Sequence, residues 1–294
     1  VYPYEAIRNA NVKSLASVIE LASTYKVKPV NFISSLTAFT LTGNSKEDPI
    51  REDDVCKDYK ELLNGYSQSK WVAERILEKV REKDIPVSIF RPAFIYGHSA
   101  NGTCNEKDLI WAVVKAIIQL KSYTELGKVQ LVSVDYVSKM VVQTAMHSEY
   151  WNKNYNLFAD GQTAFIELFR DLEKQGFSLE QIYPNEMMKQ IGSLETDNAL
   201  LAFMPMFESA DGENQFGEVY YADDNAKLLR EKFGIANSNL TTDVFRRCMK
   251  YLEEIGFVSK PKEDRSYLVM SEKKQTNSNE YSLRNPFSDM DDLI

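Results

Sequence analysis

Two short apolar segments, separated by a long amphipathic helix, constrain the fold of this chain more than any other feature. The first segment covers residues 30–33 and the second covers residues 87–91. Between them, residues 66–83 place apolar side chains such as Trp71 and Ile76 at helical spacing. Strands that are joined through a helix form parallel, right-handed crossovers. The order therefore predicts an α/β protein with a parallel sheet.

The amphipathic helix opens with the sequence G-Y-S-Q-S-K-W at residues 65–71. Tyr66 and Lys70 are four residues apart and share one helical face, so we expect the Lys70 ammonium to lower the pKa of the Tyr66 phenol. A tyrosine of this kind can act as a general acid that protonates a carbonyl oxygen. The alternative is an ordinary surface tyrosine and lysine, because the spacing Y-x-x-x-K also occurs by chance.

A serine follows the first apolar segment. Ser35 lies at the tip of the strand predicted for residues 30–33, where its hydroxyl could bind a substrate carbonyl and help to hold an oxyanion. The alternative is a capping or turn serine, a role that Ser34 and Thr37 could also fill.

The order of these motifs resembles a known superfamily. A strand ending in Ser-Ser, then Y-x-x-x-K on a helix, then a strand running into R-P-x-x-I-x-G is similar to the extended short-chain dehydrogenases/reductases. The longer run G-Y-S-Q-S-K-W-V-A-E-R-I-L resembles the signature of thioester reductase domains. These are the terminal reductases of nonribosomal peptide and polyketide synthases, aminoadipate reductases and carboxylic acid reductases. Segments 97–108, 134–137, 221–227 and 251–257 are also similar to this family, so the resemblance covers residues 1–258.

The resemblance implies a set of site residues. For catalysis it implies that Ser35 holds the carbonyl oxygen, Tyr66 protonates it, Lys70 contacts both tyrosine and cofactor ribose, and Asn11 anchors a water beside the lysine. For the cofactor, NADPH, it implies contacts from Tyr66, Lys70, Pro92 and Ile95. An ordinary helix asparagine at position 11 and a simple strand terminator at Pro92 are the alternatives.

For several other polar residues, a role in capping or starting a helix explains the sequence better than contact with a substrate. Asn105 and Asp108 are spaced as in a capping box, so we expect them to cap a helix over residues 107–120 in preference to touching substrate. Asp135 is interpreted as a helix start. The segment 204–207, M-P-M-F, is expected to pack in the core or to line a pocket.

The resemblance implies a Rossmann-type parallel sheet, with its first βαβ units missing, and a mainly helical C-terminal substrate lobe. Residues 1–159 would form the truncated NAD(P)-binding domain, with residues 98–128 contributing to the substrate region. Residues 160–260 would form a helical substrate and carrier-docking lobe without further strands, and residues 261–294 a disordered tail. The sequence pattern itself predicts a helix over residues 4–26 and, in the C-terminal lobe, helices over residues 178–190 and 193–204.

No glycine-rich phosphate loop is found among the twelve glycines. Such a loop binds the cofactor pyrophosphate at the first strand-to-helix turn of a Rossmann domain. Because the sequence begins with Val1 inside a helical pattern, we expect a fragment of a larger synthase or reductase. By itself it is expected to be poorly stable, inactive and unable to bind NADPH.

The composition limits the partners. A net charge of −8 argues against nucleic acid, and no run of eighteen apolar residues is present to span a membrane. Cys56, Cys104 and Cys248 are far apart and only two histidines occur, which predicts reduced thiols, no metal site and a cytoplasmic protein.

The resemblance implies NADPH-dependent reductive release of an acyl chain. The substrate would be a thioester on the phosphopantetheine arm of an acyl or peptidyl carrier protein, and the product an aldehyde, or an alcohol after a second reduction. A fatty acyl-CoA reductase, a nucleotide-sugar epimerase or dehydratase of the same superfamily, and a non-catalytic fragment remain as alternatives.

Overall fold

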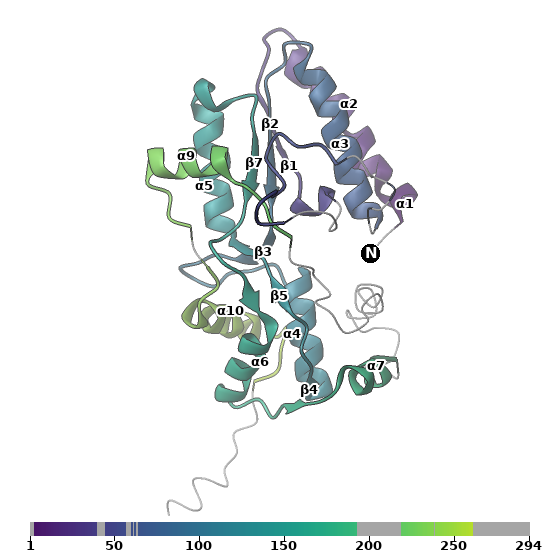
Figure 1. Ribbon diagram of the computed structural model, residues 1–294, viewed down its shortest axis with the longest axis vertical. Helices are drawn as coiled ribbons and strands as arrows, with labels where there is room; N and C mark the ends of the chain where they lie inside the picture. The colour runs from purple at the N-terminus through teal and green to yellow at the C-terminus, as the bar shows by residue number, and fades with distance from the viewer. Residues whose placement is uncertain are drawn as a thin grey trace, which may run out of the picture.

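A three-stranded parallel sheet forms the centre of the upper half of the molecule in the computed structural model (Figure 1). The structure describes residues 3–39, 45–56, 60, 62, 64–192, 219–237 and 239–260. The strands are β1 (Val30–Ile33), β2 (Val87–Pro92) and β7 (Asn154–Leu157), in the order β1-β2-β7. Val30 pairs with Val87, and Ile89 pairs with Asn154. The expected parallel α/β sheet is confirmed.

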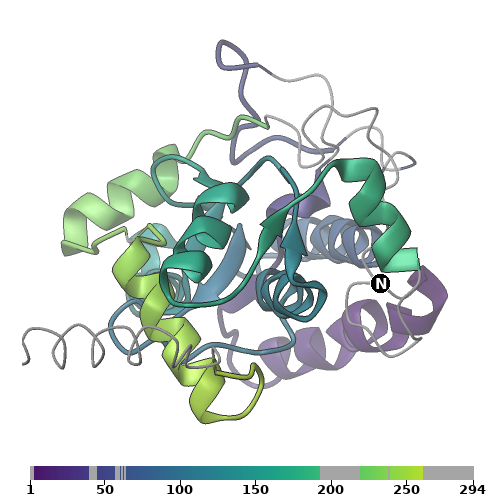
Figure 2. The same cartoon turned by 90° about the horizontal axis from the view of Figure 1, so that it is seen from below.

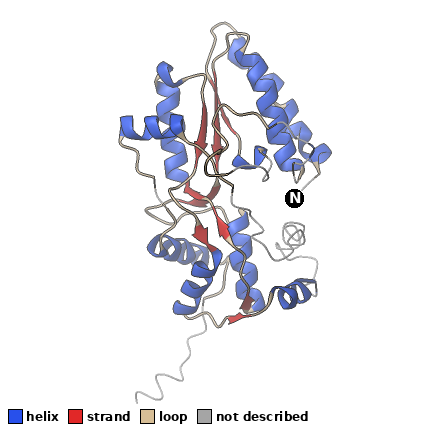
Figure 3. Ribbon diagram, in the orientation of Figure 1, coloured by secondary structure: helices blue, strands red, loops and turns tan. Residues whose placement is uncertain are grey.

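Helices cover both faces of this sheet (Figures 1 and 3). On one side lie α1 (Tyr4–Arg8), a π-helical turn (Asn9–Lys13), α2 (Leu15–Ser23) and α3 (Gly65–Arg81). On the other side lie α5 (Val134–Met146) and α9 (Asp224–Phe233). The buried residues between these layers are mostly β-branched, aromatic and leucine side chains, as expected for strands buried on both faces.

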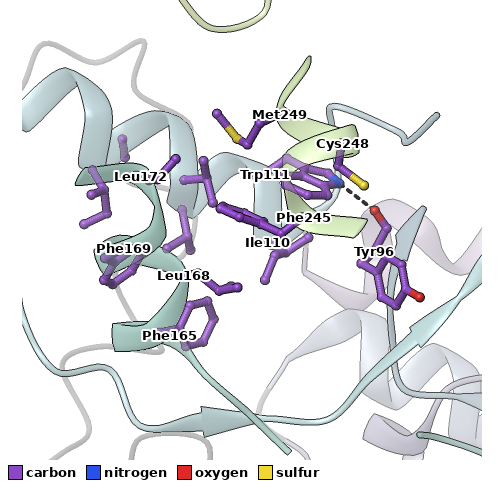
Figure 4. Close-up of a cluster of buried hydrophobic side chains, with 14 of the residues drawn as sticks. Tyr96, Ile110, Trp111, Phe165, Leu168, Phe169, Leu172, Phe245, Cys248 and Met249 are labelled. Atoms are coloured by element: carbon purple, nitrogen blue, oxygen red, sulfur yellow. Dashed lines mark hydrogen bonds between the residues drawn. The ribbon is translucent and has the colours of Figure 1, made fainter. Parts of the chain in front are cut away.

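The lower half is a helical core built around Trp111. It contains α4 (Leu109–Leu120), α6 (Phe165–Lys174) and α10 (Thr242–Glu254), and α10 lies beside α6 in the view from below (Figure 2). Trp111 stacks on Phe245 with ring centroids 6.1 Å apart and donates a hydrogen bond of 3.0 Å to the Tyr96 carbonyl (Figure 4). This bond ties the helical core to the strand that enters it.

The remaining strands are short. β3 (Phe94–Gly97) pairs in parallel with β6 (Leu131–Ser133). The pairs β4 (Ser122–Tyr123) with β9 (Glu180–Gln181), and β5 (Lys128–Val129) with β8 (Thr163–Ala164), contain two residues per strand. The remaining described elements are the 3₁₀ turns Leu36–Ala38 and Ser148–Tyr150, and α7 (Pro184–Gly192).

Several predicted elements differ from the structure. The helix predicted over residues 4–26 contains a π-helical turn at Asn9–Lys13, which apolar periodicity cannot reveal. The helix predicted over residues 178–190 is present as α7, but it starts six residues later than predicted, at Pro184, because β9 occupies residues 180–181. The expectation of no strands after residue 162 is also wrong, because two-residue strands leave no alternating pattern. The helix predicted over residues 193–204 and the M-P-M-F segment lie outside the described residues.

A buried ion pair fastens α3 to β2. Arg91 is 0% exposed and Glu74 is 1% exposed. The Arg91 guanidinium donates to both carboxylate oxygens of Glu74 at 2.9–3.2 Å, and it donates to the Glu52 carbonyl at 2.8 Å. Because both charges are fully paired, this contact positions the tyrosine helix against the sheet.

Glu52 connects three separate parts of the chain. Its carboxylate accepts backbone hydrogen bonds from Asn156 in β7 and from Asn225 and Ala226 at the start of α9, at 2.6–3.1 Å. Burial raises the pKa of this carboxyl to about 7, although the three N–H donors oppose the shift. The connection between β1 and α3 is thereby held onto the sheet and α9.

Candidate active site

A cavity of about 1040 Å³ lies where the carboxyl ends of β1 and β2 meet the helical core. Ligands bind α/β sheets at this edge. All six predicted site residues line the cavity: Asn11, Ser35, Tyr66, Lys70, Pro92 and Ile95. The structure thus brings together residues that are spread over the first third of the sequence.

Ser35 lies two residues after the end of β1. Its Oγ accepts hydrogen bonds from the Thr37 backbone N–H at 3.2 Å and from the Thr37 hydroxyl at 3.0 Å. Ser35 is therefore the N-cap of the 3₁₀ turn Leu36–Ala38. The capping alternative is correct, and the same hydroxyl also lines the cavity, where its interaction with the Tyr66 phenol lowers the pKa of that phenol.

Tyr66 lies in the first turn of α3. The residue is 41% exposed because the cavity is open, but the surrounding protein removes part of the water around its phenol. This desolvation raises the pKa of Tyr66, the hydrogen bond to Ser35 opposes the shift, and the negative charge of Asp108 adds to it. The predicted lowering of the Tyr66 pKa is wrong for the protein alone, because desolvation has the largest effect and raises that pKa.

Lys70 lies one helical turn after Tyr66. Its Nζ donates to the Ile33 carbonyl at 2.8 Å and lies 5.5 Å from the centroid of the Tyr66 ring. Desolvation lowers the pKa of Lys70, and Glu74 opposes this change. The bond to Ile33 fixes the ammonium at the end of β1, between the tyrosine and the sheet.

Asn11 reaches the tyrosine helix from the π-helical turn. Its Nδ2 donates to the Ser69 Oγ at 3.0 Å, and Ser69 in turn donates to the Tyr66 carbonyl at 2.8 Å. Turns of this kind inside helices are frequent at functional sites. Asn11 thus supports the backbone of Tyr66, a contact that the sequence did not predict.

The capping interpretation of Asn105 and Asp108 is wrong in its main part. Asp108 is the N-cap residue of α4, but its side chain makes no capping hydrogen bond. The Asp108 carboxylate instead accepts from Asn105 Nδ2 at 3.0 Å and lines the cavity. Asp135 lies in the first turn of α5, as expected, and accepts two hydrogen bonds of 2.9 Å from Ser99.

Two further cavity residues were not singled out by sequence reasoning. Asn64 is the N-cap of α3 and accepts from the Ser67 N–H at 3.0 Å. An asparagine before a helix is a capping signal, so this residue could have been found. Gln130 lies in the connection between β5 and β6 and carries no comparable signal.

The residues at this site fit a nicotinamide nucleotide. Lys70 uses one of its three N–H groups on Ile33, which leaves two for the hydroxyls of a ribose. Ser34 is 2% exposed and lines the cavity, and its Oγ has no hydrogen-bond partner among the described residues. Pro92 and Ile95 provide apolar surface at the end of β2 and in β3. Within the same described ranges, no three His, Cys, Asp or Glu side chains are placed to hold a metal ion.

Comparison with known proteins finds an NAD-binding family and several reductases or synthases that are similar to this chain. Residues 1–141 match an NAD-binding family whose description is male sterility protein. The chain is 30% identical over 262 residues to a linear gramicidin synthase of Brevibacillus parabrevis, covering 87% of this chain and 5% of that protein. It is 28% identical over 286 residues to the L-2-aminoadipate reductase of Candida glabrata (its large subunit), covering 89% and 21%. The chain therefore spans less than a quarter of either relative.

A solved structure supports the same assignment. The terminal R domain from the myxalamid PKS-NRPS biosynthetic pathway superimposes with a TM-score of 0.78 at 26% identity, covering 89% of this chain and 67% of that one. The Rossmann-like α/β fold is confirmed by this match. Within the part of the chain that the structure describes, no helix has the length and apolar character needed to cross a bilayer.

Proposed function

We propose that this chain, which belongs to the NAD-binding family described as male sterility protein, carries out NADPH-dependent reduction of an acyl thioester to an aldehyde. The premise is its homology to the reductase domains of peptide synthetases and to aminoadipate reductases. The observation that carries the proposal is the meeting of Ser35, Tyr66 and Lys70 in one cavity at the carboxyl end of the sheet. These groups can bind a carbonyl oxygen and supply a proton to it.

The residues have separate tasks in this reaction. The cofactor, when bound, supplies a hydride to the thioester carbon. The Ser35 hydroxyl donates a hydrogen bond to the carbonyl oxygen, on which negative charge then develops. Tyr66 transfers its phenolic proton to that oxygen. The resulting thiohemiacetal loses the thiol, which leaves with a proton while the carbon–oxygen double bond re-forms as an aldehyde.

The raised pKa of Tyr66 suits the role of an acid. A phenol whose pKa lies above its ordinary value stays protonated at neutral pH, so the proton is present when the oxyanion forms. After transfer, the phenolate lies within reach of the Lys70 ammonium, whose Nζ is 5.5 Å from the ring centroid. Lys70 therefore stabilises the state that follows proton transfer.

We expect Tyr66→Phe to lower turnover by about 10²–10⁴-fold, because the ring remains and only the proton donor is lost. The measurement is oxidation of NADPH by the full-length natural protein with an acyl thioester. Binding of NADPH should barely change. Tyr183→Phe is the matched control, since Tyr183 is 75% exposed and does not line the cavity. Near-parental turnover by Tyr66→Phe would show that another group is the acid.

The proposed partner is an acyl or peptidyl carrier protein that presents the thioester on a phosphopantetheine arm. The support is homology to carrier-linked synthases, and the cavity is large enough for an acyl chain entering with its arm. The full-length protein should reduce the carrier-bound thioester with a higher kcat/KM than the same acyl group on CoA or pantetheine. Equal values for all three forms would instead favour an acyl-CoA reductase.

A further inference from the structure

Asp108 carries a carboxylate in the cavity that α4 does not use. The backbone carbonyl of Asp108 accepts from the Trp111 and Ala112 N–H groups at 3.1 Å, as an N-cap residue should. Its side chain makes no capping bond and is held by Asn105 Nδ2 at 3.0 Å. No ion pair within the described ranges involves Asp108. One carboxylate oxygen is therefore left for a group inside the cavity.

This negative charge works against the chemistry proposed for the cavity. Burial raises the pKa of Asp108, the bond from Asn105 opposes the shift, and Glu106 adds to it. The Asp108 charge also raises the pKa of the Tyr66 phenol, so the two groups share one electrostatic environment. An anion near a developing oxyanion is unfavourable unless a positive or N–H-bearing group lies between them. A ligand that brings such a group would remove the conflict.

Gln130 gives an independent indication of the same ligand chemistry. It lies between β5 and β6 and lines the cavity. Its Oε1 is buried and has no hydrogen-bond partner in the described part of the chain. A buried acceptor without a donor costs free energy and calls for an explanation. Two acceptors, one charged and one without a hydrogen-bond partner, thus line the same cavity, and a ligand N–H group can donate to either of them.

We infer that Asp108, assisted by Gln130 and positioned by Asn105, binds an ammonium or amide N–H on the acyl group of the substrate and selects acyl thioesters that carry one close to the carbonyl. The inference rests on the proposed function. Asp108 would be a specificity-determining residue, because it discriminates among acyl groups without taking part in hydride or proton transfer.

An N–H donor could also come from the amides of the pantetheine arm, so the test holds the arm constant. The full-length natural protein and its Asp108→Asn variant are assayed with three pantetheine thioesters: alanyl, which has an ammonium; N-acetylalanyl, which has an amide N–H; and propionyl, which has neither. The parent should prefer alanyl to propionyl. Asp108→Asn should lower kcat/KM for alanyl by about tenfold or more, because this ligand loses its charge partner. The kcat/KM for propionyl should stay the same or rise, because with this substrate the variant removes only an unfavourable charge beside the oxyanion.

Glu106→Gln is the matched control. It removes the same charge two residues away, but Glu106 does not line the cavity, so the preference for alanyl should persist. Retained propionyl turnover in Asp108→Asn shows that this variant is folded. An equal loss for alanyl and propionyl would mean that the acceptors serve the arm, and no loss would mean that they bind nothing. Either result overturns the inference while the reductase function stands.

A binding measurement separates the inference from the proposed function. If the parent reduces none of the three thioesters, the proposed function fails, and the selectivity can still be judged with amide analogues in which nitrogen replaces the thioester sulfur. Tighter calorimetric binding of the alanyl analogue than of the propionyl analogue, lost in Asp108→Asn, would support the inference. Equal binding of both analogues would overturn it.

Discussion

The cavity is lined by two groups of residues that are constructed differently. The catalytic group consists of Asn11, Ser35, Tyr66 and Lys70, which lie on helical segments or directly after strand β1. The Asp108 group consists of Asn105, Asp108 and Gln130, which lie in connections between the short elements of the lower half. The first group is held by the buried contacts of the sheet, and the second by packing of loops against the helical core.

This difference suggests that the catalytic group determines the reaction and the Asp108 group determines which acyl groups are accepted. Catalytic groups must keep their mutual geometry, and regular elements with buried ion pairs provide it. Loops tolerate substitution, so residues on them can change the acyl group that is accepted without changing the reaction. Substitutions beneath the catalytic group should therefore affect all substrates alike, whereas those near Asp108 should affect substrates differently.

The largest expected effect comes from the ion pair beneath the catalytic group. Glu74→Gln leaves the Arg91 charge buried without a full partner, which should cost about 3–5 kcal/mol of unfolding free energy. Chemical denaturation measures the change. The control is Glu78→Gln on the same helix, whose partly exposed pair with Arg75 should be worth about 0–1 kcal/mol. Similar losses for both variants would mean that the buried pair does not anchor α3.

The next effect concerns the loop that leads to the Asp108 group. Gly102 has φ +75°, and a Cβ there would lie 2.4 Å from the backbone of Arg247 in α10. Gly102→Ala should cost roughly 2–4 kcal/mol from steric overlap and backbone strain together. Gly234→Ala is the control, since Gly234 has φ +60° but no atom within 4 Å of the added Cβ. It should cost only about 1–2 kcal/mol.

Turnover measurements provide a second difference between Gly102→Ala and its control, Gly234→Ala. The substitution should alter the relative kcat/KM values of different acyl thioesters, because the loop carries Asn105 and Asp108. Gly234→Ala should leave those ratios unchanged. Uniform changes across substrates in Gly102→Ala would contradict the separation between the two groups.

The smallest effect concerns the start of the tyrosine helix. Asn64→Ala removes the bond to the Ser67 N–H and should cost about 1 kcal/mol of unfolding free energy. Thr241→Ala removes the corresponding cap of α10 and should cost a similar amount. Only Asn64→Ala should also reduce turnover, and it should do so equally for all thioesters. If both variants reduced turnover alike, the cap would act through stability alone.

Much of the catalytic group could be predicted because it is encoded locally. Tyr66 and Lys70 are placed together by helical spacing, and Ser35 is placed by the end of a strand whose bounds, residues 30–33, agree with β1. The hydrogen bonds that hold these residues in place were harder to predict from the sequence. Asn11 supports Tyr66 through Ser69, which depends on a π-helical turn that leaves no apolar pattern. The direction of the Tyr66 pKa shift was also missed, since desolvation depends on the surrounding walls.

The sequence by itself determined the parallel α/β sheet, the order of its main elements and the spacing of the catalytic tyrosine and lysine, because periodicity and turn chemistry act over a few residues. Only the tertiary structure decided what Asp108 does. A capping box and a cavity carboxylate have the same local sequence, and the direction of the side chain depends on Asn105 and on the loops around it. The same holds for Gln130, which becomes an unsatisfied acceptor only when the folded chain buries its side chain. Contacts between distant segments are set by the packing of the whole chain, and no short pattern records them.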